Sequence, residues 1–223
     1  MSIIIFFIIA LILPIALSIY IYSKTRLNFS TFIIGFLTFF IPQVLIRIPI
    51  LYYLTSIGIS YSNTFPKQIL LALSAGLVEV GADYIAFRFV LKKNTLGNGF
   101  IIGLSHGFCE NLIIVSLPII LSILNGNLIS ISYMASFERL FALVAHISFA
   151  LFAFYAVKHK NLIYLILGIL LHALSDSLIF ILSNIYIMES AFALISIASF
   201  IAIIYIISKD KNVSKYDDIK LFI

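Results

Sequence analysis

Two short segments of the sequence each carry a histidine and a carboxylate one helical turn apart. The first is GLSHGFCEN, with His106 and Glu110, and the second is HALSD, with His172 and Asp176. Residues spaced by four lie on one face of a helix, so each segment presents an imidazole together with a carboxylate. Two such helices have the groups to hold a divalent metal or to polarise a water molecule.

A third segment, SAGLVEVGADYIAFRFVLKK at 74–93, carries two acids one turn apart in an apolar setting. Glu79 and Asp83 lie near its middle, and Arg88 lies closer to its end. At about 100° per residue, Arg88 is on the opposite side of a helix from Glu79. We therefore assign Arg88 to the membrane edge, where a long basic side chain reaches the headgroups.

The composition places these groups in an integral membrane protein. The chain has 223 residues, of which 63% are hydrophobic and 10% charged, and its mean hydropathy is +1.19. A soluble domain of this length has too few polar residues here to cover its surface. The net charge of +5 fits lysine and arginine in cytoplasmic loops, and no nucleic-acid partner is expected. The single cysteine, Cys109, excludes an internal disulfide and is expected to pack as a small apolar residue.

Seven apolar segments reach the length of about 20 residues that a membrane-spanning helix needs. Their predicted ranges are 2–22, 29–54, 68–91, 99–123, 135–157, 162–183 and 186–207. Pro42 and Pro49 predict a kink or an interfacial end in the second. The predicted fold is all-α: a polytopic membrane helix bundle in the cell membrane. A single transmembrane domain would cover residues 1–208, and a short polar tail would cover 209–223.

The basic residues predict the orientation of the bundle. Those that follow odd-numbered spans are Lys24, Arg26, Lys92, Lys93, Lys158, Lys160, Lys209, Lys211 and Lys215, whereas the opposite loops carry only Lys67. Because lysine and arginine gather in cytoplasmic loops, the N-terminus is expected outside and the C-terminus in the cytoplasm. The first segment lacks a basic start and a cleavage site, so it is expected to remain as a helix rather than act as a signal peptide.

The ionisable groups of four spans fall at one depth when helical rise is counted from the cytoplasmic ends. The groups in this band are Glu79, His106, Glu110, His146, His172 and Asp176. Each such group at mid-bilayer costs about 2.5–3.5 kcal/mol on insertion scales, so the set needs partners or a wet cavity. A single polar residue is more often a hydrogen-bonding contact between helices. Packing contacts have no reason to gather imidazoles and carboxylates at one depth, which favours a functional site.

Other residues have structural interpretations. Arg47 and the Glu138–Arg139 pair lie toward the outer side, where ion pairs between helices are expected. Gly103 and Gly107 form a GxxxG pattern that predicts close helix packing beside His106.

In four motifs the chain resembles the YhfC-like family of intramembrane proteases, related to CAAX-processing and PrsW-type membrane endopeptidases. The motifs lie within roughly 32–183 and read GLVEVGADYIAFRFVLKK, GLSHGFCEN, ERLFALVAHISFALFAF and LLHALSDSL. Glu79 matches the first of a pair of glutamates, Val80 replaces the second, and Asp83 stands where the pattern has arginine. His106, His146, His172 and Asp176 match the remaining motif positions.

The resemblance implies hydrolysis of a peptide bond in a membrane-embedded or membrane-anchored substrate. Glu79 would act as general base, and His146 would stabilise the oxyanion. His106 and His172 would orient the water or, with Glu110, bind zinc or another divalent metal; Asp176 would support His172. Either Asp83 substitutes for the missing acid or the site is degenerate, and the remaining histidines and acids favour the first.

Two other functions remain open from the sequence. Acids and histidines at mid-depth also serve proton- or cation-coupled transporters. A catalytically degenerate protease homologue that only binds membrane partners is the other alternative.

Overall fold

The computed structural model describes residues 2–25, 27–59, 64–92 and 94–210 of the chain. Within these residues the chain is helical and forms seven spans, Ser2–Lys24, Ser30–Ser56, Phe65–Val90, Leu96–Leu124, Tyr133–His159, Leu162–Ile181 and Ile185–Lys209. Each is long and apolar enough to cross a membrane, so the predicted seven-span bundle is confirmed and the protein is a multi-pass integral membrane protein. Arg26, Lys93, Lys211, Lys215 and most of the predicted tail lie outside the described residues.

Several spans change helix type along their length. The first two comprise α1 (Ser2–Phe7), η1 (Ile8–Ile12) and α2 (Leu13–Lys24), then α3 (Ser30–Phe39), η2 (Phe40–Arg47) and α4 (Ile48–Ser56). The next two comprise α5 (Phe65–Ile85) and η3 (Ala86–Val90), then α6 (Leu96–Glu110), η4 (Asn111–Ser116) and α7 (Leu117–Leu124). The last three spans are single helices, α8 (Tyr133–His159), α9 (Leu162–Ile181) and α10 (Ile185–Lys209).

The segments η1 to η4 are π-helical, and η2 corresponds to the irregularity predicted in the second span. Pro42 lies inside η2, and Pro49 lies in the first turn of α4. Proline has no N–H to donate, which weakens regular α-helical bonding around it. A π-helical turn changes which side chains face a neighbouring helix and is often found at functional sites.

Helix α8 is the centre of the bundle. It packs against α5, α6, α9 and α10, and 72% of its most apolar window is buried, the highest share of the seven spans. Small residues such as Ala145, Ala150 and Ala153 are buried along it and let neighbouring helices approach closely. This central position makes α8 a wall shared by the helices that carry the acids and histidines.

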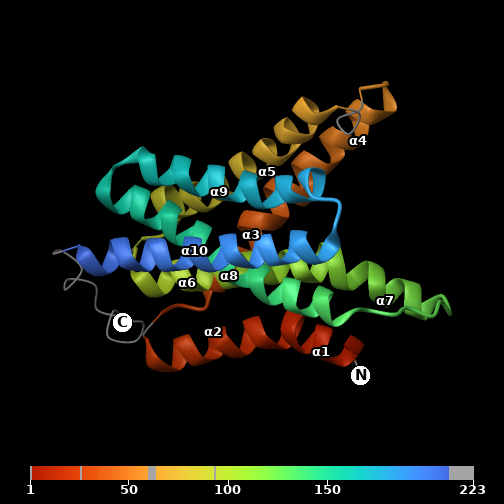
Figure 1. The fold of residues 1–223 in the computed structure, drawn as a ribbon. Helices are drawn as coiled ribbons and strands as arrows, with labels where there is room; N and C mark the ends of the chain where they lie inside the picture. Colours follow the sequence, from red (N-terminus) through yellow and green to blue (C-terminus); the bar gives the residue numbers. More distant parts are fainter. Residues whose placement is uncertain (1, 26, 60–63, 93, 211–223) are drawn as a thin grey trace.

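The start of α1 and the end of α10 lie at opposite ends of the bundle, as an odd number of crossings requires (Figure 1). The C-terminal ends of α2, α8 and α10, which carry Lys24, Lys158 and Lys209, share one end. The structure therefore gathers these basic residues as the charge pattern predicts. That this end faces the cytoplasm stays a prediction.

The predicted close packing at the GxxxG pattern is confirmed. A Cβ atom added to Gly103 would lie 2.4 Å from Ile147 Cα and 2.7 Å from the backbone oxygen of His146. A Cβ atom on Gly107 would lie 3.2 Å from His146 Cδ2. The two glycines thus set the distance between α6, which carries His106, and α8, which carries His146.

Replacing Gly103 with alanine is expected to destabilise the protein by about 1–3 kcal/mol, because the new methyl group overlaps backbone atoms of α8 that cannot rotate away. The thermal unfolding midpoint in detergent measures the effect. Gly81→Ala is the matched control on α5, where an added Cβ meets nothing within 4 Å. There the substitution should be neutral or stabilise by up to about 1 kcal/mol. Equal midpoints for both variants would contradict the close α6–α8 contact.

Candidate functional site

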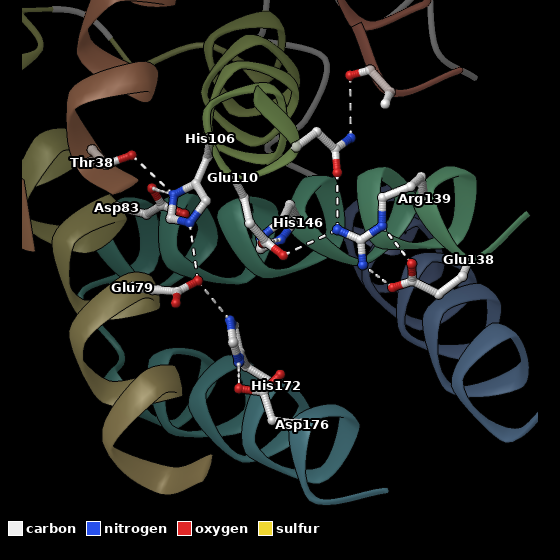
Figure 2. Close-up of polar contacts among 12 residues, drawn as sticks. Thr38, Glu79, Asp83, His106, Glu110, Glu138, Arg139, His146, His172 and Asp176 are labelled. Carbon is white, nitrogen blue, oxygen red and sulfur yellow. Dashed lines mark hydrogen bonds and ion pairs between the residues drawn. The ribbon is translucent and has the colours of Figure 1, made fainter. Parts of the chain in front are cut away.

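Four helices bring one acid and three histidines together in the interior of the bundle (Figure 2). Glu79 comes from α5, His106 from α6, His146 from α8 and His172 from α9. Their exposed fractions are 4%, 1%, 7% and 4% respectively. The common depth predicted for these groups therefore corresponds to a real cluster, in which burial strengthens every electrostatic contact.

The carboxylate of Glu79 lies between two imidazoles. Its Oε2 atom is 2.9 Å from His172 Nε2 and 3.3 Å from His106 Nε2. Figure 2 shows the two rings approaching it from opposite helices. A buried carboxylate is stable only when it is paired, and His172 Nε2 supplies a donor to it.

Asp83 contacts the other side of the His106 ring. Its Oδ1 atom is 3.1 Å from His106 Nδ1, and the hydroxyl of Thr38 on α3 is also 3.1 Å from Nδ1. The Thr38 hydroxyl donates its own proton to the backbone oxygen of Gly35. Both neighbours of Nδ1 are therefore acceptors, which assigns the ring proton to Nδ1. The two acids one turn apart on α5 thus hold the two nitrogens of a single imidazole.

This assignment leaves a lone pair on His106 Nε2 that faces the Glu79 carboxylate. Two acceptor atoms at 3.3 Å repel each other unless a positive charge lies between or beside them. That charge is either a second ring proton or a metal cation. The contact therefore fits either a doubly protonated ring or a metal ion, which would use both lone pairs at once.

His146 is held by a second carboxylate. Its Nε2 atom lies 2.6 Å from Oε2 of Glu110, so it donates to that carboxylate and leaves Nδ1 with the lone pair. Arg139 holds Glu110 in place: its Nη1 donates to Glu110 Oε1 at 3.4 Å and to Asn111 Oδ1 at 3.1 Å. Arg139 also pairs with Glu138. The predicted ion pairing between helices is therefore confirmed for Arg139, through Glu110.

His172 differs from His106 in what it offers to Glu79, because it donates a proton where His106 has a lone pair. Its Nε2 atom lies at hydrogen-bond distance from Glu79 and donates to that carboxylate. Its Nδ1 atom is buried and lies 3.4 Å from Asp176 Oδ2, a contact of ion-pair length that makes no hydrogen bond. The Asp176 side chain is 40% exposed. His172 therefore links the buried Glu79 to a partly exposed carboxylate that lines the cavity.

The residues that best fit a metal ion are Glu79, His106 and His146. One ligand atom from each lies within 4.8 Å of the other two, and all three residues are buried. The other nitrogen of His106 is held by Asp83 and that of His146 by Glu110, the arrangement that orients histidine ligands in metal sites. The set expected from the sequence, His106, Glu110 and His172, shares only His106 with this group. Glu110 contacts His146, and His172 contacts Glu79.

Aromatic rings and an open cavity complete the site. Phe39 packs edge-on against His106 at 5.3 Å between ring centroids, and Phe149 lies 5.0 Å from His172. A cavity of about 410 Å³ adjoins the cluster. Its lining includes Glu79, Glu110, His146, His172, Asp176, Arg47, Glu138, Arg139 and Glu189. The cavity is large enough for several water molecules and a short stretch of peptide beside the histidines.

The structure corrects the prediction for Arg47. Its guanidinium donates to the backbone oxygen of Leu71 at 2.8 Å, to Ser74 Oγ at 3.1 Å and to Gln43 Oε1 at 3.2 Å. No described acidic residue forms an ion pair with it, so the expected ion pair between helices is wrong. The physical reason is that Glu79 is already engaged by histidines, whereas α5 offers uncharged acceptors close by.

Three other expectations agree with the structure. Arg88 is exposed, as expected for the membrane edge. Cys109 is fully buried and packs as a small apolar residue. Val80 is also buried and faces α9, where an added Cβ on Gly168 would lie 3.2 Å from Val80 Cγ1. A second glutamate at position 80 would therefore point at packed backbone of α9.

No pattern in the sequence selects Thr38, which shares His106 Nδ1 with Asp83. Threonine in the run TFIIGFLTFF looks like an ordinary membrane-helix residue. Asn111 was likewise unassigned, although it follows Glu110 directly and contacts the same arginine. Only the packing of α3 and α8 against α6 reveals these two roles.

Replacing Asp83 with asparagine is expected to weaken divalent-metal binding about 10- to 100-fold, because the ring of His106 loses the carboxylate that orients it. Isothermal titration of the detergent-purified protein with Zn²⁺ measures the affinity. Asp176→Asn is the control, since Asp176 contacts His172, which is outside the three-residue ligand group. A loss of affinity for Asp176→Asn with none for Asp83→Asn would contradict the assignment of ligands.

Comparison with known proteins identifies a family whose sequence model matches the chain. The sequence model of the YhfC intramembrane metalloprotease family matches residues 9–133 and 116–204. A protein of Bacillus subtilis (strain 168), described as the uncharacterized membrane protein YhfC, is 28% identical over 201 residues. That alignment covers 74% of this chain and 78% of the relative. No solved structure matches the chain.

Proposed function

The chain belongs to the YhfC intramembrane metalloprotease family, and we propose that it hydrolyses a peptide bond of a membrane-embedded or membrane-anchored protein. The observation that carries the proposal is the buried contact of Glu79 with His106, beside a polar cavity inside an apolar bundle. A buried group of acids and histidines is costly in a membrane protein, and catalysis gives a reason to keep it.

Glu79, His106 and His146 would hold the metal. Two imidazole nitrogens and one carboxylate form a donor set used by catalytic zinc, which keeps a further position open. When bound, the ion acts as a Lewis acid that activates water and polarises the scissile carbonyl. Asp83 and Glu110 hold one nitrogen of each ring, which leaves Nε2 of His106, facing Glu79, and Nδ1 of His146 as the atoms that would bind the ion.

His172 is our choice for the group that moves protons. Its Nε2–H donates to Glu79, and Asp176 lies beside its other nitrogen. The attacking water would give its proton to the Asp176 carboxylate at the cavity, which would share that proton with His172 Nδ1 and return it to the leaving amine. This division of roles differs from the one implied by the resemblance, in which Glu79 is the base. Here Glu79 is a ligand, and the partly exposed Asp176 connects His172 to the cavity.

Arg139 and Glu110 support the site from the side of the cavity. Arg139 forms an ion pair with Glu110, the carboxylate that holds His146. The negative charge of this partly buried carboxylate is therefore compensated. The surrounding apolar helices limit the access of water. Interactions with developing charge are therefore stronger than in bulk solvent.

The experiment is a cleavage assay with the purified protein in liposomes and a library of membrane-anchored peptides, read by mass spectrometry. Wild-type cleavage that disappears in Glu79→Ala, His106→Ala and His172→Ala supports the proposal. The same liposomes are tested for uptake of protons and cations under a pH gradient. Gradient-driven uptake with no cleavage of any peptide would replace the protease by a transporter.

A further inference from the structure

A second hollow lies between the second and third spans, on the other side of Arg47 from the catalytic cavity. It has a volume of about 770 Å³. We call it the η2–α5 groove; its lining is Pro42, Ile46, Arg47, Ile50, Leu51, Leu54, Leu70, Leu71, Ser74, Leu77, Val78, Gly81, Ala82 and Ile85. Apart from Arg47 and Ser74, these residues have apolar side chains or none.

The groove lies along two apolar helix faces that turn away from the bundle core. Ile50, Leu70 and Leu77 are 51%, 60% and 60% exposed, so they face the surroundings of the protein. In Figure 1, α4 and the beginning of α5 project from the upper right of the bundle, apart from α6 and α8. For a membrane protein such surfaces face hydrocarbon, where an apolar lining is compatible with both lipid and a protein helix.

The groove and the catalytic cavity meet at Arg47 and Leu71, which line both. Arg47 ties the two spans together there, by donating to the backbone oxygen of Leu71 and to Ser74 Oγ. On α5, Val78 lines the groove and the next residue, Glu79, lines the cavity. A peptide chain in the groove would therefore contact the same turn of α5 that carries the candidate ligand Glu79.

We propose that the η2–α5 groove binds the membrane-spanning segment of a protein substrate and delivers one end of it to the catalytic cavity. This inference rests on the proposed function. A peptide bond within a helix has its carbonyl bonded internally, so a membrane helix must unwind before it is cut. Each carbonyl freed in hydrocarbon costs several kcal/mol unless a donor replaces the lost bond.

Arg47 is the donor at the point where unwinding would occur. Its guanidinium has five N–H donors, and three of them donate to Leu71, Ser74 and Gln43. Carbonyls of an entering chain can replace these uncharged acceptors one for one. The continuity with the cavity and the donors at the junction favour a peptide over an acyl chain, which has no carbonyls along its length.

The wall of the groove also permits close approach of a helix. Gly81 has open space where a Cβ would lie, with nothing within 4 Å. Ala82, next to it, and Ser74, two turns earlier on α5, are also small, and all three residues line the groove. Small residues let two membrane helices approach closely, which gives the packing energy that replaces the hydrophobic effect in lipid.

The test uses disulfide cross-linking to a single-span leucine–alanine peptide that is flanked by lysines and carries one central cysteine. The protein carries Glu79→Gln, so the peptide is not consumed. Cysteine is placed in the groove at Leu77, 60% exposed, and on α9 at Ile166, 52% exposed, as control. The native Cys109 is fully buried and does not compete. We expect about tenfold more cross-link from Leu77→Cys, the ratio for about 1.4 kcal/mol of preference.

Equal cross-linking at the two faces would overturn the groove as a docking site. So would labelling of the groove by a photoactivatable phospholipid that excess peptide does not displace, since this result identifies a lipid site. Cross-linking selective for the groove, together with no cleavage by the wild type, keeps the docking inference and refutes the protease. The two proposals can therefore fail separately.

Filling the groove gives a second, independent variant. Gly81→Phe places a large side chain where space is open, so folding is retained while a docked helix is excluded. We expect at least about a tenfold loss of peptide cross-linking from Leu77→Cys. Leu170→Phe, on the exposed face of α9, is the matched control and should change nothing. Undiminished cross-linking in Gly81→Phe would contradict the proposed position of the substrate helix.

Discussion

Glu79→Gln is expected to lower peptide-bond cleavage on the order of a thousandfold or more, because a metal ion supplies several kcal/mol of transition-state stabilisation and the variant loses its charged ligand. The glutamine has the same shape, so the cavity and the helix packing remain. It removes the negative charge that His106 and His172 contact, and with it the charged ligand of the proposed metal site. Initial rates of cleavage of a labelled transmembrane peptide in liposomes measure the effect.

Glu189→Gln is the matched control for this prediction. Glu189 lines the same cavity but is not among the groups that contact the histidines of the cluster. Its replacement should change the rate by less than about threefold, as expected for residues that touch no reacting group. Thermal unfolding of both variants verifies that they fold. A Glu79→Gln protein that folds and cleaves at the wild-type rate would remove Glu79 from the mechanism.

The second large effect separates two histidines that both contact Glu79. His106→Ala should lower bound zinc at least about tenfold, because it removes a ligand, and cleavage should be lost with the metal. His172→Ala should keep the zinc but lower the rate by about 10²- to 10⁴-fold, because it removes the group that moves protons. Elemental analysis of the purified proteins gives the metal content, and the liposome assay gives the rate.

The pattern of the two variants decides between ligand sets. Loss of zinc in His172→Ala with retention in His106→Ala would reverse the roles proposed here. His146→Ala provides an internal check, since it should also lose zinc as the third member of the ligand group. Full activity in protein that contains no metal would refute the metalloenzyme altogether and return Glu79 to the role of general base.

The seven spans were predictable from hydropathy because the length of a helix that crosses hydrocarbon is set by the bilayer. The predicted 135–157 corresponds to Tyr133–His159, and the predicted 186–207 to Ile185–Lys209. The close α6–α8 contact was also predictable, because Gly103 and Gly107, spaced by four, let a neighbouring helix backbone approach closely. The π-helical segments were harder to predict from the sequence. Pro42 indicates one irregularity, whereas η4 contains no proline to mark it.

The candidate site was predictable as a set of residues but not as a set of contacts. Spacing by four suggested that His106 and Glu110 act together on one helix. In the structure Glu110 contacts His146 of α8 instead, and His106 contacts Glu79 and Asp83 of α5. Sequence spacing gives the face of a helix, whereas the neighbouring helix determines which group is met there.

Asp83 illustrates the same limit. The departure from the family pattern at this position suggested an acid that replaces the missing neighbour of Glu79. Its carboxylate lies on His106 Nδ1 instead, together with the Thr38 hydroxyl. This assigns Asp83 a positioning role that requires a negative charge, which an arginine at this position would not supply. The role depends on the approach of α6 to α5, about which the sequence of α5 contains no information.

Peptide-bond hydrolysis by this protein is tested by cleavage in water labelled with ¹⁸O. Wild-type protein in liposomes is incubated with the transmembrane peptide library, and the products are analysed by mass spectrometry. Hydrolysis predicts paired fragments of one peptide, with a single ¹⁸O atom in the new carboxylate of the N-terminal fragment and none in the Glu79→Gln sample. Intact peptides throughout, from folded and zinc-loaded wild-type protein, would contradict it.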